Sequence, residues 1–366
     1  MPKKLRIAIL YNEPVAGSEE NRKYIGENGK LNEGPLPRRK VSNGKTAVQS
    51  SVDLSELGVL EEMQDIKAAL DTIGYKASIF NVDSNVGRLI DYLREQKPGL
   101  IFNLVECVEN ESIQEMNIAG LYELMKIPYT GANPMTLGTA LNKARVKEIL
   151  TYHGINTPKF QLVRTTAKAT VRDDLRFPLI VKPSREDASV GISDESIVNT
   201  VSDLRKRIRY IHQEFDQAAL VEEYVEGREF NVAIVGNRKP IVFPISEIDF
   251  SGLTDGMHRI VSYEAKWMNG TVAYEGTKGV CPANITSSLE SQLKDIALRC
   301  YQLIGCRDYA RVDFRVSKDN TPYMLEVNPN PDISDDAGFA RSARAYGWSF
   351  PEVVTKIVES ALERCS

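Results

Sequence analysis

Two segments near the end of the chain carry charged and amide side chains at the spacing of paired β-strands. Residues 309–316 (YARVDFRV) alternate charged with apolar side chains, and residues 323–328 (YMLEVN) follow the turn-forming sequence SKDNTP. This pattern predicts an antiparallel hairpin whose turn centres on Asp319 and Asn320. The chemistry of its polar face then depends on which side chains lie opposite each other.

The predicted pairing brings two carboxylates together. With that turn, Asp313 lies opposite Glu326 and Arg311 lies opposite Asn328. Like charges that face each other on a sheet repel, so a positive charge is expected between them. Magnesium accepts carboxylate and amide oxygens and takes its other ligands from water and phosphate. The pattern therefore favours a magnesium site, and two solvated acids on an exposed sheet face are the alternative.

The composition indicates a globular protein that acts on small molecules. Its 366 residues, 42% hydrophobic and 26% charged, suffice for two or three domains. A net charge of -4 and the lack of a long apolar run argue against nucleic-acid and membrane partners, and the start MPKKLRIAIL does not resemble a secretory signal. Five cysteines without a C-x-x-C pair favour reduced thiols and a cytoplasmic protein. The sequence also has no G-x-S-x-G, no G-x-G-x-x-G and no complete P-loop, and its three histidines lack metal-ligand spacing.

Residues 1–131 predict an open α/β domain with a parallel sheet. Apolar runs without strict alternation are typical of parallel strands buried on both faces, and they occupy residues 5–11, 76–82 and 99–105. Helical patterns separate them, with Ser84 as the expected cap of the second helix. A polar segment at about residues 13–53 is too long for an ordinary connection, so we expect a mobile flap or a disordered insert.

The remaining chain divides into a small α+β lobe, residues 132–225, and a C-terminal lobe with an antiparallel sheet, residues 226–366. In the first, one helix is predicted from the cap Asn133 to the terminator Gly154. Two short strands at residues 177–184 and 219–225 bracket a Gly/Ser loop and a basic helix. The second lobe is predicted to contain the extended segments EFNVAIVG, VFPISEI and RIVSYEAKW, and a helix over residues 287–304.

The ordered set of these segments resembles the ATP-grasp superfamily and, within it, the D-alanine:D-alanine ligase family. The resemblance covers nearly the whole chain after the insert and rests on IPYTGANPMTLGTALNKARVKEIL, FPLIVKPSREDASVGIS, ALVEEYVEGREFNVAIVG, YEAKW, CPA, YARVDFRV and YMLEVNPNPD. It implies a three-lobed ATP-grasp fold, with ATP and magnesium, or manganese, as cofactors. It also implies small carboxylate and amine substrates and a homodimer formed through the N-terminal lobe.

The resemblance implies a role for each residue that matches the family pattern. Phosphate binding falls to Lys143, Lys182 and the loop SREDASVGIS with Ser189, and adenosine binding falls to Glu222, the backbone of Val225, and Glu229. Lys266 would touch the terminal phosphate, Arg311 would stabilise the charged intermediate, and magnesium would be held by Asp313, Glu326 and Asn328. Independently, Lys182 ends an apolar strand, where a charge is costly unless it is paired. A lysine that snorkels to solvent is the alternative.

The implied reaction is a two-step ligation. A substrate carboxylate attacks the terminal phosphate of ATP, and an amine then displaces phosphate from the acyl phosphate to form an amide. Because acyl phosphates hydrolyse, a lid should exclude water, and residues 251–279, which include Lys266, are the candidate.

Several positions depart from the family pattern in the substrate pocket. Ala188 stands where the family has a serine and Trp267 where it has a tyrosine, so the serine–tyrosine latch of the family is missing. The glutamate that completes this latch is not recognisable, and Glu56 is only a guess at its equivalent. Glu106, after the third apolar run, is a candidate partner for the ammonium group of the donor, and an exposed loop acid is the alternative.

The loop after the hairpin is unusually acidic, with Asp332, Asp335 and Asp336. These acids would repel the carboxylate of a second D-alanine. We therefore hypothesise amino-acid-like substrates other than two D-alanines, with an acceptor that bears a cation. A D-alanine:D-alanine ligase proper, a kinase-like ATP-grasp enzyme, and a non-catalytic nucleotide-binding protein with the same fold are the alternatives.

Overall fold

The computed structural model describes residues 5–13, 23–25, 31–33, 54–109, 111–165, 171–334 and 337–365. Most of the predicted insert therefore lies outside the described residues. The expectation that it is a mobile flap or disordered concerns those same residues. Within it, the short strands β2 (Lys23–Ile25) and β3 (Leu31–Glu33) pair antiparallel.

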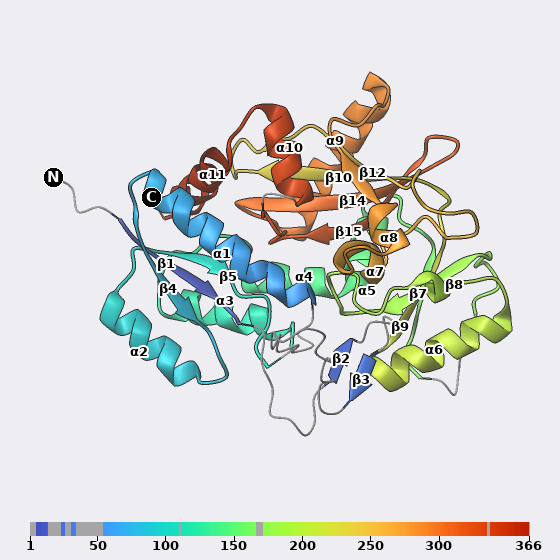
Figure 1. Ribbon diagram of the computed structural model, residues 1–366, viewed down its shortest axis with the longest axis horizontal. Helices are drawn as coiled ribbons and strands as arrows, with labels where there is room; N and C mark the ends of the chain where they lie inside the picture. Colours follow the sequence, from blue (N-terminus) through green and yellow to red (C-terminus); the bar gives the residue numbers. More distant parts are fainter. Residues whose placement is uncertain are drawn as a thin grey trace, which may run out of the picture.

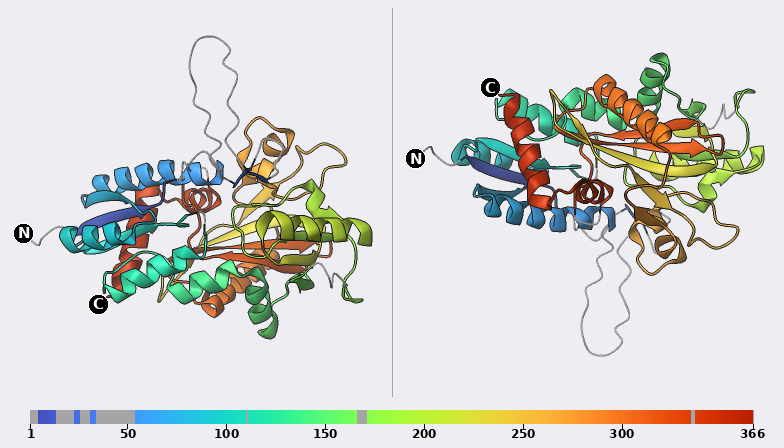
Figure 2. Two further views of the ribbon diagram at one scale, coloured as in Figure 1. Left: turned by 90° about the horizontal axis from the view of Figure 1, so that it is seen from below. Right: turned by 90° about the horizontal axis from the view of Figure 1, so that it is seen from above.

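The first lobe is built on a three-stranded parallel sheet, as the apolar runs predicted. The strands are β1 (Arg6–Tyr11), β4 (Lys76–Asn81) and β5 (Leu100–Leu104), in the order β4–β1–β5. Helices α1 (Leu54–Thr72) and α11 (Phe350–Glu363) share one apolar core with the sheet, and α2 (Val86–Gln96) and α3 (Gln114–Leu124) share the other. The end of the chain thus returns to the first lobe, and Figure 2 shows α11, in red, among the blue elements. The cap of α2 is Asn85, not Ser84, because the Asn85 side chain accepts from the backbone N–H of Arg88.

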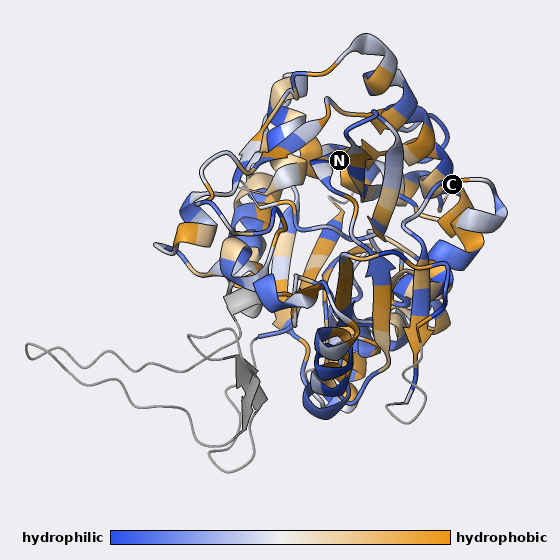
Figure 3. Ribbon diagram, turned by 90° about the vertical axis from the view of Figure 1, so that its right-hand side faces the viewer, coloured by the Kyte–Doolittle hydropathy of each residue, from blue (hydrophilic) through white to orange (hydrophobic). Residues whose placement is uncertain are grey.

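The central lobe has a four-stranded antiparallel sheet in the order β6–β9–β7–β8. Its strands are β6 (Phe160–Val163), β7 (Leu179–Pro183), β8 (Ile197–Val198) and β9 (Ala219–Glu223). Helix α6 (Val201–Phe215) covers it with Leu204, Ile208 and Ile211. Many helices and strands carry orange and blue residues side by side in Figure 3, as expected for amphipathic elements.

The predicted helix from Asn133 to Gly154 is two helices. Asn133 caps α4 (Pro134–Leu141) as predicted, and Gly154 follows α5 (Lys143–Tyr152) with φ +72. Asn142 breaks the run because its side chain leaves the helix and accepts from the N–H of Arg145, so that it caps α5. Lys143 therefore lies in the first turn of a helix and not in the middle of one.

The C-terminal lobe contains an antiparallel sheet with a path of β13–β12–β10–β14–β15, and β11 (Ile241–Val242) pairs with β10. The strands on the path are β10 (Gly227–Val235), β12 (Ser246–Asp249), β13 (Lys278–Val280), β14 (Tyr309–Ser317) and β15 (Pro322–Asn328). Helix α9 (Ser287–Ile304), predicted correctly, shares the core of one face, and α10 (Gly338–Tyr346) packs on the other with α11 (Figure 1). The segment RIVSYEAKW is not extended: Ser262 caps a short helix, α7 (Tyr263–Trp267), and α8 (Val272–Glu275) follows.

The hairpin of β14 and β15 pairs Asp313 with Glu326, as predicted. Between this pair and the turn, a β-bulge shifts the register and leaves Leu325 without a partner on β14. The turn centres on Asp319 alone, which corrects the predicted centre on Asp319 and Asn320. The bulge compensates for this difference, so the polar ends of the strands still meet as expected.

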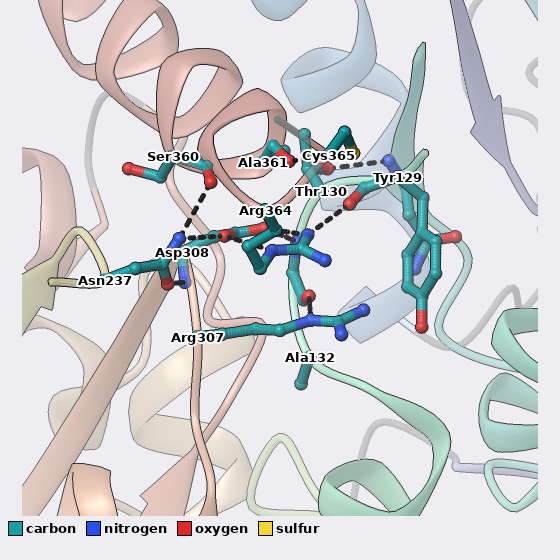
Figure 4. Close-up of polar contacts among 12 residues, drawn as sticks. Tyr129, Thr130, Ala132, Asn237, Arg307, Asp308, Ser360, Ala361, Arg364 and Cys365 are labelled. Atoms are coloured by element: carbon teal, nitrogen blue, oxygen red, sulfur yellow. Dashed lines mark hydrogen bonds and ion pairs between the residues drawn. The ribbon is translucent and has the colours of Figure 1, made fainter. Parts of the chain in front are cut away.

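A polar network around the buried Asp308 joins the first and C-terminal lobes (Figure 4). Its carboxylate accepts from the N–H of Gly131 at 2.9 Å, from Asn237 at 3.0 Å and from Arg364 at 3.0 and 2.7 Å. Arg364 also donates to the carbonyl of Tyr129 at 2.7 Å. One carboxylate thus holds the end of the first lobe, a turn of the C-terminal sheet and the last helix in fixed positions.

Replacing Asp308 with asparagine should lower the free energy of unfolding by about 3 kcal/mol, because it leaves the partly buried Arg364 without its counter-charge. Urea unfolding followed by circular dichroism measures this change. Asp295→Asn, which changes an exposed acid on α9, is the matched control and should unfold like the wild type. Equal unfolding midpoints for Asp308→Asn and the wild type would show that the network is not needed for stability.

Candidate functional site

A cavity of ≈ 990 Å³ lies between the lobes and collects the predicted site residues. All but one of them line it: Glu106, Lys143, Lys182, Ser189, Glu222, Val225, Glu229, Lys266, Trp267, Arg311, Asp313, Glu326, Asn328 and Asp332. The exception is Glu56, which belongs to α1 but whose side chain lies outside the described residues.

The hairpin acids are surrounded by donors from the protein itself. Asp313 accepts from the Nε of Arg311 at 2.9 Å, from Asn231 at 2.7 Å and from Asn328 at 3.0 Å. Arg311 pairs with Asn328 across the hairpin, as predicted. Glu326 lies 3.4 Å from Lys143 and 3.3 Å from the amide nitrogen of Asn328. Protein cations therefore already compensate the two acids, and their mutual repulsion does not by itself require a metal.

The two acids differ in their electrostatics. Burial raises the pKa of Asp313 although Arg311 opposes the shift. Burial acts in the same direction on Glu326, but Lys143, Lys182 and Arg311 together hold the pKa of Glu326 well below its usual range. Glu326 is therefore ionised at neutral pH.

The donor set at the hairpin is compatible with a magnesium ion that takes most of its shell from phosphate and water. It offers two carboxylates and one amide, while no group of three or more His, Cys, Asp or Glu in the described part of the chain could hold a metal. The amide nitrogen of Asn328 faces both carboxylates, so the amide would have to turn to present its oxygen.

Two lysines of the central lobe share one buried glutamate. Lys182 and Lys147 each lie 2.9 Å from a carboxylate oxygen of Glu222, and all three side chains are buried. The alternative of a snorkelling Lys182 is therefore wrong. Burial lowers the pKa of Lys147 to about 8, and, against the effect of burial, the two lysines lower the pKa of Glu222. Lys147 was not predicted from the sequence, although it occupies the same face of α5 as Lys143, four residues later.

Two further charged residues of the cavity were also missed. Asp187, in the predicted phosphate loop, lies 2.8 Å from the Nζ of Lys143. Arg315 lies 3.0 Å from Glu229, whose pKa burial raises even though Arg315 opposes the shift. The alternation of β14 put Arg315 on the polar face, but no role followed from that pattern alone.

The segment between β12 and β13 contacts the phosphate loop through several hydrogen bonds. The indole N–H of Trp267 donates to the carbonyl of Ala188 at 2.8 Å, and Ser189 donates to the carbonyl of Val261 at 2.9 Å. Lys266 lies 4.6 Å from the centre of the Trp267 ring. Ala188 and Trp267, the two positions that were expected to lack a latch, are therefore in contact. The contact is a hydrogen bond from an indole to a backbone carbonyl and not one between two side chains.

Trp267→Phe should loosen this segment and lower kcat by about tenfold, because the variant keeps an aromatic ring but loses the indole N–H that bonds to Ala188. Steady-state turnover assays measure the effect. Trp348→Phe, which changes the other tryptophan of the chain, is the control and should keep the wild-type kcat, because Trp348 packs against the apolar core that α11 shares with the first lobe. A Trp267→Phe enzyme with unchanged kcat would rule out a role for the indole bond.

The other end of the cavity carries acids. Glu62 of α1, 5% exposed, accepts from the N–H of Ile333 at 2.9 Å, and Glu115 of α3 accepts from Asn330 at 2.7 Å. Asp332 accepts from the N–H and hydroxyl groups of the nearby Ser334, and the exposed Glu106 lines the same region. Asp335 and Asp336 lie outside the described residues. Glu62 and Glu115 were missed, although an acid within the buried face of α1, between Val59 and Ile66, is a signal that sequence alone contains.

The chain is similar in sequence to known proteins. A family model described as the D-ala D-ala ligase C-terminus matches residues 146–359. The chain is 32% identical to the uncharacterized protein y4sG of Sinorhizobium fredii, over 82% of this chain and 87% of that protein. It is 30% identical to a D-alanine–D-alanine ligase of Pelotomaculum thermopropionicum, over 81% of this chain and 90% of that ligase.

Solved structures agree on the fold. The D-alanine–D-alanine ligase of Bacillus anthracis superimposes with a TM-score of 0.71 at 22% identity and 98% coverage of both chains. The same ligase complexed with ATP gives a TM-score of 0.69 at 21% identity, again over 98% of both chains. These matches confirm the predicted three-lobed ATP-grasp fold. No helix in the described ranges is both long and apolar enough to cross a bilayer.

Proposed function

The chain belongs to the D-alanine–D-alanine ligase family and is an ATP-dependent ligase, and from that premise we propose that it joins a carboxylate to an amine through an acyl phosphate. ADP and phosphate are the other products. The observation that carries this proposal is that lysines, the hairpin acids and Arg311, which come from different lobes, line the same cavity. The ATP complex of the Bacillus anthracis ligase supports ATP as the phosphate donor.

The nucleotide is assigned to the space between the central and C-terminal lobes. Its phosphates contact Lys143, Lys182 and the loop of Ser189, and its adenosine contacts Glu222, the backbone of Val225, and Glu229. The lysine pair around Glu222 supports this assignment, because it keeps that carboxylate ionised and able to accept from an amino group. Arg315 fixes the carboxylate of Glu229 at the ribose end.

The magnesium ion is assigned to Asp313, Glu326 and Asn328, with two carboxylates and an amide as donors. When bound, it would neutralise phosphate charge and so reduce the repulsion of an anionic nucleophile. The protein contributes in the same way through Lys143, which is buried against Glu326 and Asp187 and whose pKa these acids raise against the effect of burial.

The reaction centre is assigned to Lys266 and Arg311. Lys266 enters from the segment that bonds to the phosphate loop, so it contacts the terminal phosphate only when that segment is in place. Arg311 is held by hydrogen bonds from two nitrogens of its guanidinium to Asp313, and it would stabilise the oxyanion that forms when the amine attacks. The same segment excludes water from the acyl phosphate.

The substrates are proposed to be amino-acid-like and not two D-alanines. Ala188 and Trp267 replace the side chains with which the family latches its first D-alanine, and Asp332 brings a negative charge to the acceptor end. Glu106 is assigned to the ammonium group of the donor. Glu56 is a second candidate for the donor end of the pocket. The division into lobes at residues 131/132 and 225/226 likewise stays a proposal, since α11 packs on the first lobe.

The test is a screen of amino acids and amines for ADP and phosphate release, with the mass of each product. Amine-dependent ADP release together with an amide product supports the proposed ligase. D-alanyl-D-alanine as the best product would favour a D-alanine–D-alanine ligase proper. ATP binding without turnover under every condition would favour a non-catalytic nucleotide-binding protein, and a phosphorylated stable acceptor would favour a kinase.

A further inference from the structure

Among the described residues, a buried acid at the acceptor end of the cavity has no cationic partner. Glu62 is 5% exposed and lines the cavity from α1. One carboxylate oxygen accepts from the N–H of Ile333, and the other has no hydrogen-bond partner among the described residues. Burial, together with Asp332 and Glu106, raises the pKa of Glu62 well above its usual range. A carboxyl group in that position is costly to ionise until a cation reaches it.

The neighbours of Glu62 add negative charge instead of neutralising it. Asp332 lies on the loop that Glu62 holds through Ile333, and its hydrogen bonds go to Ser334. Within the described part of the chain, neither acid forms an ion pair with a lysine, arginine or histidine. Two cations of the cavity that Asp332 influences have other contacts, since Arg311 is bonded to Asp313 and Lys266 lies over Trp267.

The spacing of these acids fits an organic cation better than a metal ion. In the ranges that the structure describes, no three acidic, histidine or cysteine side chains converge closely enough to hold a metal. An ammonium or guanidinium group at the end of a side chain can instead contact one oxygen of each acid, and it needs only hydrogen-bond distance from each.

Resting on the proposed function, we propose that the amine acceptor is dibasic, with a second cationic group that Glu62 and Asp332 bind. The attacking amine then points towards Arg311, and the second ammonium or guanidinium group points towards α1. Glu62 is thus a specificity-determining residue: it selects the acceptor, and it takes no part in the transfer of phosphate or of the acyl group.

The first experiment measures binding by calorimetry in the presence of ADP and magnesium, with L- and D-lysine, L- and D-arginine, and norleucine. Norleucine is the matched ligand because it has the chain length of lysine without the ammonium group. We expect lysine or arginine to bind about 30-fold more tightly than norleucine, because a buried carboxylate gains its missing partner. Glu62→Gln should remove most of that preference, while Glu61→Gln, which changes the exposed neighbour on α1, should keep it.

The second measurement guards against misfolding and separates this inference from the proposed function. Glu62→Gln removes a buried, uncompensated acid, so its thermal unfolding temperature should equal or exceed that of the wild type. Equal binding of lysine, arginine and norleucine, or an equal loss for all of them in Glu62→Gln, overturns the dibasic acceptor even if the enzyme ligates neutral amines. If basic ligands bind selectively but no amine supports ADP release, the ligase proposal fails and the cation site stands.

Discussion

Arg311→Met is expected to lower kcat by about 1,000-fold, with a much smaller change in KM, because the variant loses charge stabilisation at the proposed tetrahedral intermediate. The guanidinium is largely shielded from solvent, and burial lowers the pKa of Arg311, but Asp313 and Glu326 more than offset this effect and raise the pKa above its ordinary value. Rates of ADP release at saturating substrate, together with the KM of each substrate, measure the effect.

Two variants make this prediction specific. Arg311→Lys keeps a positive charge but cannot bond Asp313 through two nitrogens, so its kcat should fall between those of the wild type and Arg311→Met. Arg145→Met, which removes an exposed arginine from α5, should leave kcat unchanged. A large rise in KM with a normal kcat in Arg311→Met would instead assign this arginine to substrate binding.

The hairpin illustrates why part of the site could be predicted from sequence. The alternation of β14 fixes which side chains share its polar face, and this is a local property of the chain. The predicted pairing of Asp313 with Glu326 was also correct, but it depends on a bulge at Leu325 that the sequence pattern did not predict. The prediction succeeded at the site because the misplaced turn and the unforeseen bulge compensate each other.

The site contacts that could not be predicted from the sequence are those between segments that lie far apart along the chain. Lys147 and Glu222 belong to different elements, and only the packing of α5 against the central sheet makes their burial and pairing evident. Glu62 accepts a hydrogen bond from the N–H of Ile333, which lies 271 positions later in the chain, so its place in the cavity could not be predicted from its neighbours in sequence. Trp267 was treated as the loss of a latch, because a side chain that bonds to a backbone carbonyl leaves no signature at the partner residue Ala188.

The predicted single helix that is interrupted at Asn142 is a second case in which the sequence pattern was misleading, but here the cause is local. Apolar spacing continues across the break, so periodicity favoured one helix, but the asparagine side chain competes for a backbone N–H and starts a second helix. The break matters for the site because Lys143 then begins α5 and its backbone N–H donates to the carbonyl of Ser184 in the phosphate region.

Glu326→Gln is the second prediction with a large expected effect. It should lower kcat/KM by about 100-fold and raise the magnesium concentration for half-maximal rate by about tenfold, because a neutral amide is a weaker ligand than a carboxylate. The variant is nearly isosteric, and it keeps an oxygen within reach of Lys143 and Asn328. ADP release measured across a magnesium titration, repeated with manganese, gives both quantities.

The magnesium titration decides between two ways in which Glu326 could matter. If Glu326 binds the metal, high magnesium should restore part of the activity of Glu326→Gln. The control Glu290→Gln, which changes a partly exposed acid of α9 paired with Lys294, should titrate like the wild type. If Glu326 acts only by holding Lys143, the variant should lose activity with an unchanged magnesium midpoint, and Lys143→Met should reproduce its defect. The second result would remove Glu326 from the proposed metal site and leave Asp313 and Asn328 as too small a donor set, because two protein ligands without a second charge bind magnesium weakly.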